Sequence, residues 1–515
     1  MDQSSNNGAM LPHAWTGDYD DGFPPTLLAQ LKMCAASNAI REKPLWWQKF
    51  KDPVIAAKWE QEILDRDESR VKKTRNSTAN EDNVQAQGMG LDSHEEDNSD
   101  GGDNVELSSQ HEDDDEGADE EEGEDRVVAH HTKLKKEHLR FVFQELEWYA
   151  DQRQQQVDQV DVPEHLKDWH PGSNKQVLDL VHPSLFPAVV GETRITTEPA
   201  IPALECIGKG TVLRSEDLPP VAESRRYEKF FSKKYQWLPT DFSVSSEGKV
   251  KIMSYINNLH PVEHADMYPV LEEIFEKFLP MFEEVLAEMQ GLMNKPQRLN
   301  VDDGWYETPK DLINVPFRQQ DRDYQTREKE WYRTRVPKPA DIPDTFVAQP
   351  ALEPYNLKTD NPLQVIVKLA NIELTPENPI YSGGSWHVEG MMNENIVASG
   401  IYYYHSENVT DTRLNFRITV VEPDYEQGDA RGCRIMYGLE DEEALSQPLD
   451  GIVTKQDRCI VFPNIYQHQV QPFELVDKTR PGTRQILVFF LVNPECKVLS
   501  TTNVPPLGRV CGFDG

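Results

Sequence analysis

The segment RLNFRITVV (413–421) alternates strictly between polar and apolar side chains, and its apolar residues Leu414, Phe416, Ile418 and Val420 are spaced two positions apart. Side chains of a β-strand point to opposite faces in turn, so the pattern predicts a strand with one buried face. Other short apolar or β-branched segments follow one another from about residue 360: QVIVKLANIEL (364–374), IVASGIYYY (396–404), RCIVFP (458–463), YQHQVQPFEL (466–475) and RQILVFFLV (484–492). Short strands separated by turn signals predict a sandwich or barrel of the jelly-roll type.

Helical periodicity precedes these strands. Apolar residues recur at helical spacing at Ile55, Trp59 and Ile63, again around Leu139, and over about 264–292, where Pro280 predicts a kink. Residues 305–350 are rich in charge and proline and predict an extended connection. Since helices come first and strands afterwards, the sequence predicts an α+β fold in which an N-terminal and central helical region supports the barrel.

These transitions divide the chain into six segments: a flexible tail (1–25), an N-terminal helical segment (26–75), an acidic disordered insert (76–132), a helical or mixed supporting region (133–350), a β-rich core (351–500) and a C-terminal tail (501–515).

The acidic insert dominates the charge of the chain. Residues 76–125 contain 20 Asp or Glu and no Lys or Arg, out of a formal net charge of −36 for the whole sequence. A tract so charged and so poor in apolar residues predicts disorder. Two interpretations stay open, a solvated loop insert and a docking arm for a basic partner such as a histone tail. The negative balance argues against nucleic acid as a main ligand, since phosphate binding needs clustered Lys or Arg.

The cysteines and the N-terminal residues bear on the compartment. The six cysteines lie far apart without a C-x-x-C pair, which excludes the common zinc-ribbon and thioredoxin signatures. The start of the sequence lacks the positive and apolar regions of a secretory signal, and no apolar run reaches the roughly 18 residues of a membrane span. We therefore expect a cytosolic or nuclear protein without membrane contact.

The phrase YSGGSWHVEG (381–390) places His387 and Glu389 two residues apart, so that in a strand both side chains point to the same side. The spacing alone carries little information, because four similar pairs occur: His94/Glu96, His111/Asp113, His264/Asp266 and His405/Glu407. The first two fall in the acidic insert, the third near a helix start where i and i+2 do not face each other, and the fourth at a strand end, as expected of a surface pair. His387 alone also fits a buried histidine that is hydrogen-bonded to Glu389 without a metal.

Two further residues favour a metal at this pair. His468 lies in a predicted strand, and Arg484 opens the last strong strand after a Pro-Gly turn. Two imidazoles and one carboxylate on one face of a metal form the facial triad of non-haem Fe(II) oxygenases, whose open positions bind a bidentate 2-oxo acid and O₂. An arginine suits the far carboxylate of such a co-substrate. Arg480 is the alternative anchor, but it lies in the polar turn DKTRPG.

Residues 381–490 resemble the double-stranded β-helix core of the Fe(II)/2-oxoglutarate-dependent dioxygenases, in which H-x-D/E is followed by a distal His and then by a basic residue on the last core strand. GTRQILVFFL is similar to the ending of prolyl-hydroxylase-like members. Glu389 stands where most members have Asp, and both Arg480 and Arg484 lie farther from His468 than the basic residue usually does. The resemblance implies that residues 351–500 form a double-stranded β-helix catalytic core.

Most of the chain outside the acidic insert also resembles a mainly fungal family defined as a domain of unknown function. The shared phrases are HPSLFP (182–187), YQWLPTDF (235–242), SYINNLHP (254–261), SWHVEG (385–390) and FPNIYQHQVQPF (462–473). This second resemblance implies no activity.

The main hypothesis is therefore an oxygenase. Fe(II) held by His387, Glu389 and His468 would bind 2-oxoglutarate, and O₂ would oxidise it to succinate and CO₂ while a substrate is hydroxylated or demethylated. Arg484 would bind the distal carboxylate of 2-oxoglutarate. Further contacts to the co-substrate are expected from Tyr402 and Tyr404. The sequence identifies neither the substrate, a basic protein or a small molecule, nor the oligomeric state. Two alternatives remain, a non-catalytic jelly-roll scaffold with an acidic docking arm and a cupin-like metalloenzyme that does not use 2-oxoglutarate.

Overall fold

The structure is a computed structural model, and it describes residues 11, 23–43, 46–67, 168–170, 172–196, 210–218, 230–292, 305–313, 315–335, 337–338, 344–345, 352–423, 425 and 429–506. The acidic tract of residues 76–125 and the helix expected around Leu139 lie outside these ranges. Helices combine with mostly antiparallel sheets, in agreement with a mixed fold class. No helix within the described ranges is both long and apolar enough to span a membrane.

The largest sheet has eight strands and is built around β9 (Leu363–Leu374). On one side of β9 the order is β17 (Gly482–Val492), β11 (Ile396–Glu407) and β14 (Arg458–Pro463), all antiparallel to their neighbours. The remaining strands extend the sheet beyond the other edge of β9: β1 (Asp168–Trp169), β2 (Val177–Val181), β7 (Thr240–Val244) and β8 (Val250–Ile252).

A second sheet places β12 (Thr412–Thr419) between β13 (Ser446–Thr454) and β15 (Tyr466–Val470). Leu414, Phe416 and Ile418 are buried and alternate with half-exposed neighbours, which confirms the predicted strand and its apolar face. Three short antiparallel pairs complete the strands: β10 (Ile380–Tyr381) with β16 (Phe473–Glu474), β3 (Ala188–Val189) with β6 (Tyr235–Gln236), and β4 (Arg194–Ile195) with β5 (Thr211–Val212).

An apolar cluster joins the two sheets. It combines Val488 and Phe490 of β17 and Phe462 of β14 with Leu414 and Phe416 of β12. The ring centroids of Phe416 and Phe462 lie 5.0 Å apart, so the apolar face of β12 is buried against the larger sheet. This intersheet cluster defines an inner face of the large sheet.

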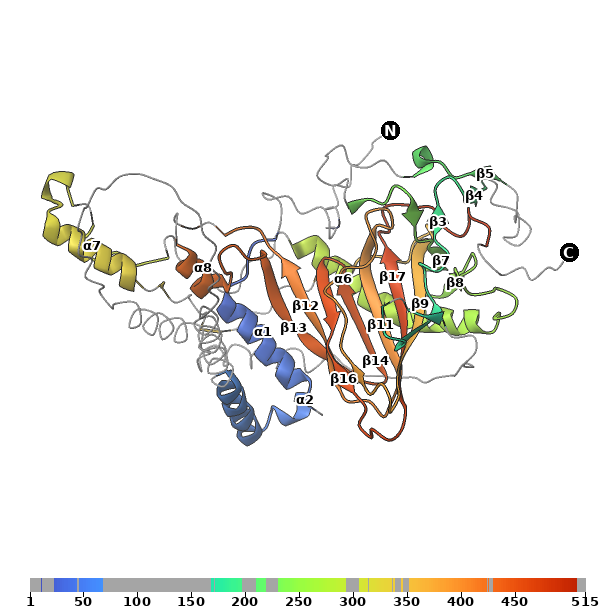
Figure 1. The fold of residues 1–515 in the computed structure, drawn as a ribbon, viewed down its shortest axis with the longest axis horizontal. Coiled ribbons are helices and arrows are strands. Elements are labelled where there is room, and N and C mark those ends of the chain that lie inside the picture. The colour runs from blue at the N-terminus through green and yellow to red at the C-terminus, as the bar shows by residue number, and fades with distance from the viewer. Residues whose placement is uncertain are drawn as a thin grey trace, which may run out of the picture.

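Helix α6 (Met267–Leu292) covers the other, outer face of the large sheet (Figure 1). Phe275 and Phe278 of the helix meet Phe489 edge-on, with ring centroids 5.1 and 5.4 Å apart. The approach is close at Gly400 of β11, where an added Cβ would lie 2.7 Å from the Phe278 ring. The expected helical layer is thus present, and the helix continues through Pro280.

The N-terminal helices form a separate apolar cluster beside the second sheet. Helices α1 (Leu28–Arg41) and α2 (Trp46–Lys49) are followed by a helix over residues 53–67, and α1 lies near β13 and α8 (Ala430–Tyr437) (Figure 1). Trp59 and Ile63 are buried in this cluster and Ile55 packs against it, so the helix face expected from their spacing is confirmed.

Residues 305–350 do not form the extended connection expected from their charge and proline content. They contain a 3₁₀ turn, η5 (Phe317–Gln319), and the helix α7 (Arg322–Thr334). Asp321 caps this helix by accepting a hydrogen bond from the Tyr324 N–H at 2.8 Å, and no proline interrupts it. An N-cap aspartate satisfies an amide at the helix start that would otherwise lack a partner, which offsets the weak apolar pattern of this segment.

The expected order of helices followed by strands is also wrong for the supporting region. Strands β1 to β8 and the 3₁₀ turn η3 (Ser215–Asp217) all lie within residues 168–252. These strands have two to five residues each, too few for the periodicity that distinguishes a strand from a loop. The segments expected to be tails are partly packed as well, because Leu11 is buried against the α6 layer and Val504 is buried in another apolar cluster.

Candidate metal centre

Two histidines face each other across an isolated antiparallel bridge. The His387 N–H donates to the His468 carbonyl at 3.2 Å, and the His468 N–H donates to the His387 carbonyl at 2.9 Å. Directly opposite residues of an antiparallel pair project their side chains to the same face. The two imidazole centroids are accordingly 4.2 Å apart, and His468 is buried beside Phe462 of the intersheet cluster.

A glycine allows the chain to run along β15 and to bring His387 into this position. Gly383 has a φ of +91°, which L-residues rarely adopt, and an added Cβ would lie 2.8 Å from the Val470 carbonyl oxygen. The next residue, Gly384, donates its N–H to the same carbonyl at 2.9 Å. The Gly-Gly-Ser turn therefore sets the register that pairs the two histidines.

The Glu389 carboxylate completes a group of three donors. Its Oε1 lies 3.3 Å from His468 Nε2 and 3.6 Å from His387 Nε2. All three side chains offer one ligand atom within 4.8 Å of the others. The burial is graded, with His468 buried, Glu389 half-buried and the His387 side chain 44% exposed. One side of the group thus opens outward while the other faces the core.

Asn464 positions the backbone of Glu389. The Glu389 N–H donates to Asn464 Oδ1 at 2.9 Å, and Asn464 Nδ2 donates to the carbonyls of Glu389 and Ile396 at 2.9 and 3.0 Å. Asn464 is buried in the turn between β14 and β15, next to the strand that carries His468. A single amide therefore links two of the elements that present the donors.

The charges of the three groups depend on one another. Burial raises the pKa of Glu389, but His387 and His468 outweigh it, so this pKa lies well below its ordinary value and the carboxylate is ionised. Burial lowers the pKa of His468 and keeps its imidazole neutral. For His387 burial also acts to lower the pKa, and the adjacent Glu389 carboxylate raises it overall.

The donor set fits a divalent transition metal. His387 Nδ1 lies 2.8 Å from the Ser385 carbonyl, which can only accept a hydrogen bond, so Nδ1 carries a proton and Nε2, which faces Glu389, is the atom that could ligate a metal. The N···O separations of 3.3 and 3.6 Å exceed those of charge-assisted hydrogen bonds, about 2.7–2.9 Å. They are close to the roughly 3 Å expected between neighbouring ligands of one metal ion.

Arg484 lies buried on the inner face of β17, on the same side as Val488 and Phe490. Its Nη1 donates to Thr454 Oγ1 at 3.0 Å, its Nη2 donates to the Thr410 carbonyl at 3.2 Å, and the guanidinium stacks 4.5 Å from the Phe473 ring centroid. Among the described residues no carboxylate lies within ion-pair distance of it. Burial lowers the pKa of Arg484 from its ordinary value.

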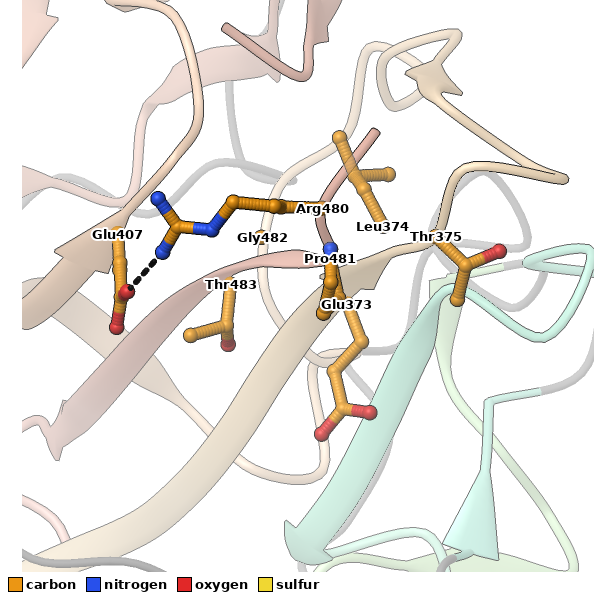
Figure 2. Close-up of a pocket in the computed structure, with 8 residues that line it drawn as sticks. All are labelled: Glu373, Leu374, Thr375, Glu407, Arg480, Pro481, Gly482 and Thr483. Carbon is orange, nitrogen blue, oxygen red and sulfur yellow. Dashed lines mark hydrogen bonds and ion pairs between the residues drawn. The ribbon is translucent and has the colours of Figure 1, made fainter. Parts of the chain in front are cut away.

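Arg480 is located differently. Figure 2 shows its guanidinium directed at Glu407, 3.3 Å away, in a surface pocket that is also lined by Gly482 and Thr483. The Arg480 side chain is 62% exposed, and none of the three metal-centre residues lines this pocket. Of the two candidate arginines, only Arg484 faces the interior.

The two tyrosines expected to contact the co-substrate lie on the outer face of β11, opposite to the face on which Arg484 lies. Tyr402 belongs to the cluster on the outer face that packs against α6, and Tyr404 packs against the same cluster. Tyr403 points to the inner face, where burial raises its pKa and Arg484 is near enough to oppose that shift. The single-residue alternation of a strand leaves only the middle tyrosine on the side of Arg484.

The competing His-x-acid pairs do not form comparable groups. His405 Nε2 and Glu407 Oε2 lie 3.8 Å apart at the end of β11, and the Glu407 side chain is 59% exposed, as expected of a surface pair. Neither this pair nor His264/Asp266 belongs to a three-donor group among the described residues. The pairs at His94 and His111 lie outside the described residues.

A second group of donors, which the sequence patterns did not predict, consists of His170, Asp179 and His182. Burial, followed by the charge of Lys368, lowers the pKa of His182 to about 4. No spacing motif in the sequence indicates this group, because it is the pairing of two short strands that brings its members together. Asn464 was missed as well, and its only signal is an asparagine between two predicted strands in the phrase FPNIYQHQV.

Three solved structures show low similarity to the chain. They are "Crystal structure of IDO from Bacillus thuringiensis" (15% identity, TM-score 0.15), hydroquinone 1,2-dioxygenase PnpCD with Cd²⁺ and 4-hydroxybenzonitrile (11%, 0.13), and the selenomethionine-labelled Fe(II)/(alpha)ketoglutarate-dependent dioxygenase TqaL (11%, 0.19). The matches cover 25%, 25% and 54% of this chain, and 49%, 58% and 72% of those chains. The chain thus spans about half the length of the first two structures, and TM-scores this low assign neither fold nor activity.

A search of curated proteins found no match. Two family models do match the chain. One covers residues 1–62 and is described as the N-terminal domain of unknown function DUF4246. The other covers residues 147–509, which include both sheets and all three residues of the metal centre. The chain therefore belongs to the family described as "Protein of unknown function (DUF4246)".

Proposed function

We propose that His387, Glu389 and His468 hold one Fe(II) ion and that the chain is a 2-oxoglutarate-dependent oxygenase. The observation that carries the proposal is the convergence of two imidazole Nε2 atoms on one carboxylate oxygen, at 3.3 and 3.6 Å. Two histidines and one carboxylate on one side of a metal leave further positions open, as in non-haem Fe(II) oxygenases. The His387 side chain is the most exposed of the three, so the open metal positions would lie on its side of the group.

The strand order supports a double-stranded β-helix around this centre. The large sheet has the order β9-β17-β11-β14, and the second has β13-β12-β15, which the bridge of His387 to His468 extends by one position. Along the chain, β11 is followed by two strands of the second sheet, then β14, β15 and β17 alternate between the sheets. We interpret this alternation as a jelly roll that encloses the intersheet cluster.

Arg484 supports 2-oxoglutarate as the co-substrate. A buried cation without a carboxylate in direct contact is costly, and the Arg484 guanidinium has neutral hydrogen-bond partners only, with the Asp411 charge acting on its pKa from beyond ion-pair distance. The far carboxylate of a five-carbon 2-oxo diacid would supply that charge, and the planar guanidinium can bind it with two hydrogen bonds. Arg484 lies on the inner face, and His468 reaches the same face through its contact with Phe462. Tyr403 is the tyrosine available for a further contact.

Each residue then has a defined task. Bound Fe(II) would supply the activation of O₂, in which the 2-oxo acid is oxidised to succinate and CO₂ and a C–H bond of the substrate is oxidised. Glu389 contributes the negative charge that lowers the net charge of the site. The Ser385 carbonyl holds His387 in the tautomer that ligates through Nε2. Arg484 orients the co-substrate, and the apolar side chains between the sheets exclude water.

The test is anaerobic purification followed by metal analysis and a succinate assay with 2-oxoglutarate. Uncoupled turnover of 2-oxoglutarate needs no identified substrate, so the assay does not depend on knowing whether that substrate is a basic protein or a small molecule. We expect bound iron and succinate production. Iron without 2-oxoglutarate turnover or binding would favour a cupin-like metalloenzyme instead, and a chain that binds no metal at all would favour a non-catalytic scaffold.

A further inference from the structure

A second group of metal-type donors lies at the edge of the large sheet, on strands that the proposed function does not use. His170 directly follows β1, Asp179 lies in β2 and His182 directly follows β2. Trp169 pairs with Leu178, and the His170 N–H donates to the Val177 carbonyl. His170 and Asp179 are therefore diagonal neighbours on one face of the hairpin, which lets their side chains meet.

The three side chains are close and mostly buried. One ligand atom from each lies within 4.8 Å of the other two. His170 Nδ1 is 2.7 Å from Asp179 Oδ2, the distance of a charge-assisted hydrogen bond, and the ring centroids of His170 and His182 are 5.3 Å apart. Asp179 and His182 are 4% and 5% exposed, whereas the His170 side chain is 40% exposed. An ion could thus reach the group from the side of His170.

The buried carboxylate is left incompletely satisfied. Asp179 Oδ1 is buried and has no hydrogen-bond partner, although Oδ2 of the same carboxylate contacts His170. A buried carboxylate oxygen without a donor or a cation is costly, so such atoms rarely remain unpaired in native proteins. The free oxygen belongs to the same carboxylate that the two histidines surround.

The His182 ring is fixed in a position that suits ligation. Its Nδ1 lies 2.6 Å from Ser184 Oγ and accepts the Ser184 backbone N–H at an N···N distance of 3.2 Å, and its edge packs against Trp237 with centroids 6.1 Å apart. A cation at Nε2 requires the other tautomer, in which Nδ1–H donates to Ser184 Oγ and the Ser184 N–H gives up its bond to Nδ1. Trp237 in turn stacks on Phe490 of the intersheet cluster, so the ring is held by the core and not by solvent-exposed groups.

We propose that His170, Asp179 and His182 form a second site, for a first-row divalent transition-metal ion. Two imidazoles and one carboxylate are the donor types that such ions prefer over Mg²⁺ or Ca²⁺. The site uses none of the first centre's residues and is built on different strands, although the Glu389 carboxylate is near enough to act on the pKa of His182. The inference therefore does not rest on the proposed oxygenase function.

Lys368 sets a limit on the affinity. Val181 pairs with Leu369, so His182 and Lys368 are the next residues along the two antiparallel strands. An ammonium group at that position repels a cation. The charge of Lys368 acts on both groups, since it acts to lower the pKa of His387 as well as that of His182. Because Lys368 lies directly beside His182 on the paired strand, we expect its repulsion to be larger there and the second site to bind more weakly than the centre at His387.

The experiment is an anaerobic titration of the full-length, metal-free chain with Co²⁺, followed by ligand-field absorption and calorimetry. Wild type should bind two equivalents at these groups. Asp179→Asn and His182→Ala should each weaken the binding of one Co²⁺ equivalent by more than about 100-fold. This exceeds the roughly 10- to 100-fold loss of affinity that is typical when a residue next to a ligand, and not the ligand itself, is changed. His387→Ala should remove the other equivalent. His405→Ala, which changes a histidine outside both groups, should bind as wild type does.

The variants serve as folding controls for one another, because each should keep the equivalent that its substitution does not touch. The second site is disproved if Asp179→Asn and His182→Ala bind Co²⁺ as wild type does, which would leave His170 and Asp179 as a hydrogen-bonded pair. That result does not affect the first centre. Conversely, if His387→Ala binds as wild type does and Asp179→Asn loses an equivalent, the second site stands and the proposed function fails.

Discussion

His387 and His468 exchange both backbone hydrogen bonds, at 3.2 and 2.9 Å, although 81 positions separate them in the chain. The pairing is an isolated bridge and not part of a longer ladder, so the register of the two side chains depends on the turn at Gly383 and on the start of β15. Both imidazoles therefore reach Glu389 from the same side. This relationship underlies the first prediction.

His387→Ala and His468→Ala should each abolish tight Fe(II) binding at this centre. Each substitution deletes a donor directly, so affinity should fall by much more than the roughly 10- to 100-fold typical of changes next to a ligand. Anaerobic Fe(II) titration measures the loss. His405→Ala is the matched control, because His405 also precedes a glutamate by two residues but lies in a surface pair. Unchanged affinity in either triad variant would remove that residue from the site.

Asn464→Ala should weaken the same site without removing a ligand. The amide holds the Glu389 backbone from both sides and also binds the Ile396 carbonyl, so its loss frees Glu389 and leaves buried polar groups unpaired. We expect about 10- to 100-fold weaker Fe(II) binding and a loss of about 1–3 kcal/mol in the free energy of unfolding. Asn464→Asp retains the acceptor for the Glu389 N–H but places a second acceptor against the Glu389 and Ile396 carbonyls, so it should weaken binding at least as much as Asn464→Ala. A stability loss with normal metal affinity would mean that Asn464 has only a structural role.

The sequence predicted β9, β11, β12, β14, β15 and β17, because each shows alternation or a continuous apolar run. It missed β13, in which Pro448, Asp450 and Gly451 interrupt the pattern. The buried face of β12 follows directly from the spacing of Leu414, Phe416 and Ile418. Helix α7 was missed because its start depends on one capping aspartate. Strands β1 to β8 were missed because each is too short to show a repeating pattern of apolar residues. Periodicity is informative only over several residues.

The candidate site shows the same limit. His387 and Glu389 could be paired from local spacing, and His468 from the strand that contains it. The sequence could not show which of the tyrosines at 402–404 points to the inner face. A shift of one residue in the register of a strand moves every side chain to the opposite face, and no local pattern fixes that register here. The group of His170, Asp179 and His182 arises from the register of β1 with β2 and from a register shift of β2 on β9 between Asp179 and Val181, neither of which the residue types reveal.

Gly400→Ala should destabilise the protein through a clash between β11 and α6. The new Cβ would lie 2.7 Å from two carbons of the Phe278 ring, closer than packed atoms approach. Overpacking of this kind costs about 1–3 kcal/mol in the free energy of unfolding, measurable by chemical denaturation. Gly291→Ala is the control within α6, where the added Cβ makes ordinary contacts with Leu352 and the stability should stay the same or rise by up to about 1 kcal/mol. Equal stability of Gly400→Ala and wild type would contradict this packing.

Glu394 should make stability fall as pH rises. Burial raises the pKa of Glu394 above its ordinary value, while its two oxygens accept the N–H groups of Trp237 and Met391. Between the unfolded-state pKa of Glu394, about 4.3, and its higher native-state pKa, the native state keeps a proton that the unfolded state has lost. The stabilisation from this protonated carboxyl is therefore complete below the unfolded-state pKa and is lost as pH rises through the native-state pKa. Glu394→Gln removes this dependence. Thermal unfolding of both proteins across pH measures the difference, and parallel curves would contradict the assignment.

Arg484→Ala should abolish tight 2-oxoglutarate binding while Fe(II) stays bound, because the arginine is not a metal ligand. Removing one partner of a desolvated charge pair costs about 2–5 kcal/mol, which corresponds to roughly 30- to 4,000-fold in affinity. Arg484→Lys should recover only part of the loss, since a point charge cannot form two parallel hydrogen bonds with a carboxylate. Anaerobic titration of 2-oxoglutarate into the Fe(II)-loaded protein, followed by its charge-transfer absorption, measures both variants.

Arg480→Ala provides the control for this prediction. Arg480 is largely exposed and its partner is Glu407, so its charge is screened and the change in 2-oxoglutarate affinity should be less than about threefold. Retained Fe(II) binding shows that the Arg484 variants are folded, although they lose the bonds to Thr454 and Thr410. If Arg480→Ala loses the co-substrate and Arg484→Ala does not, the anchor lies in the surface pocket and not between the sheets. If wild type holds iron but binds no 2-oxoglutarate, Arg484 has a different anionic partner and the oxygenase assignment fails with it.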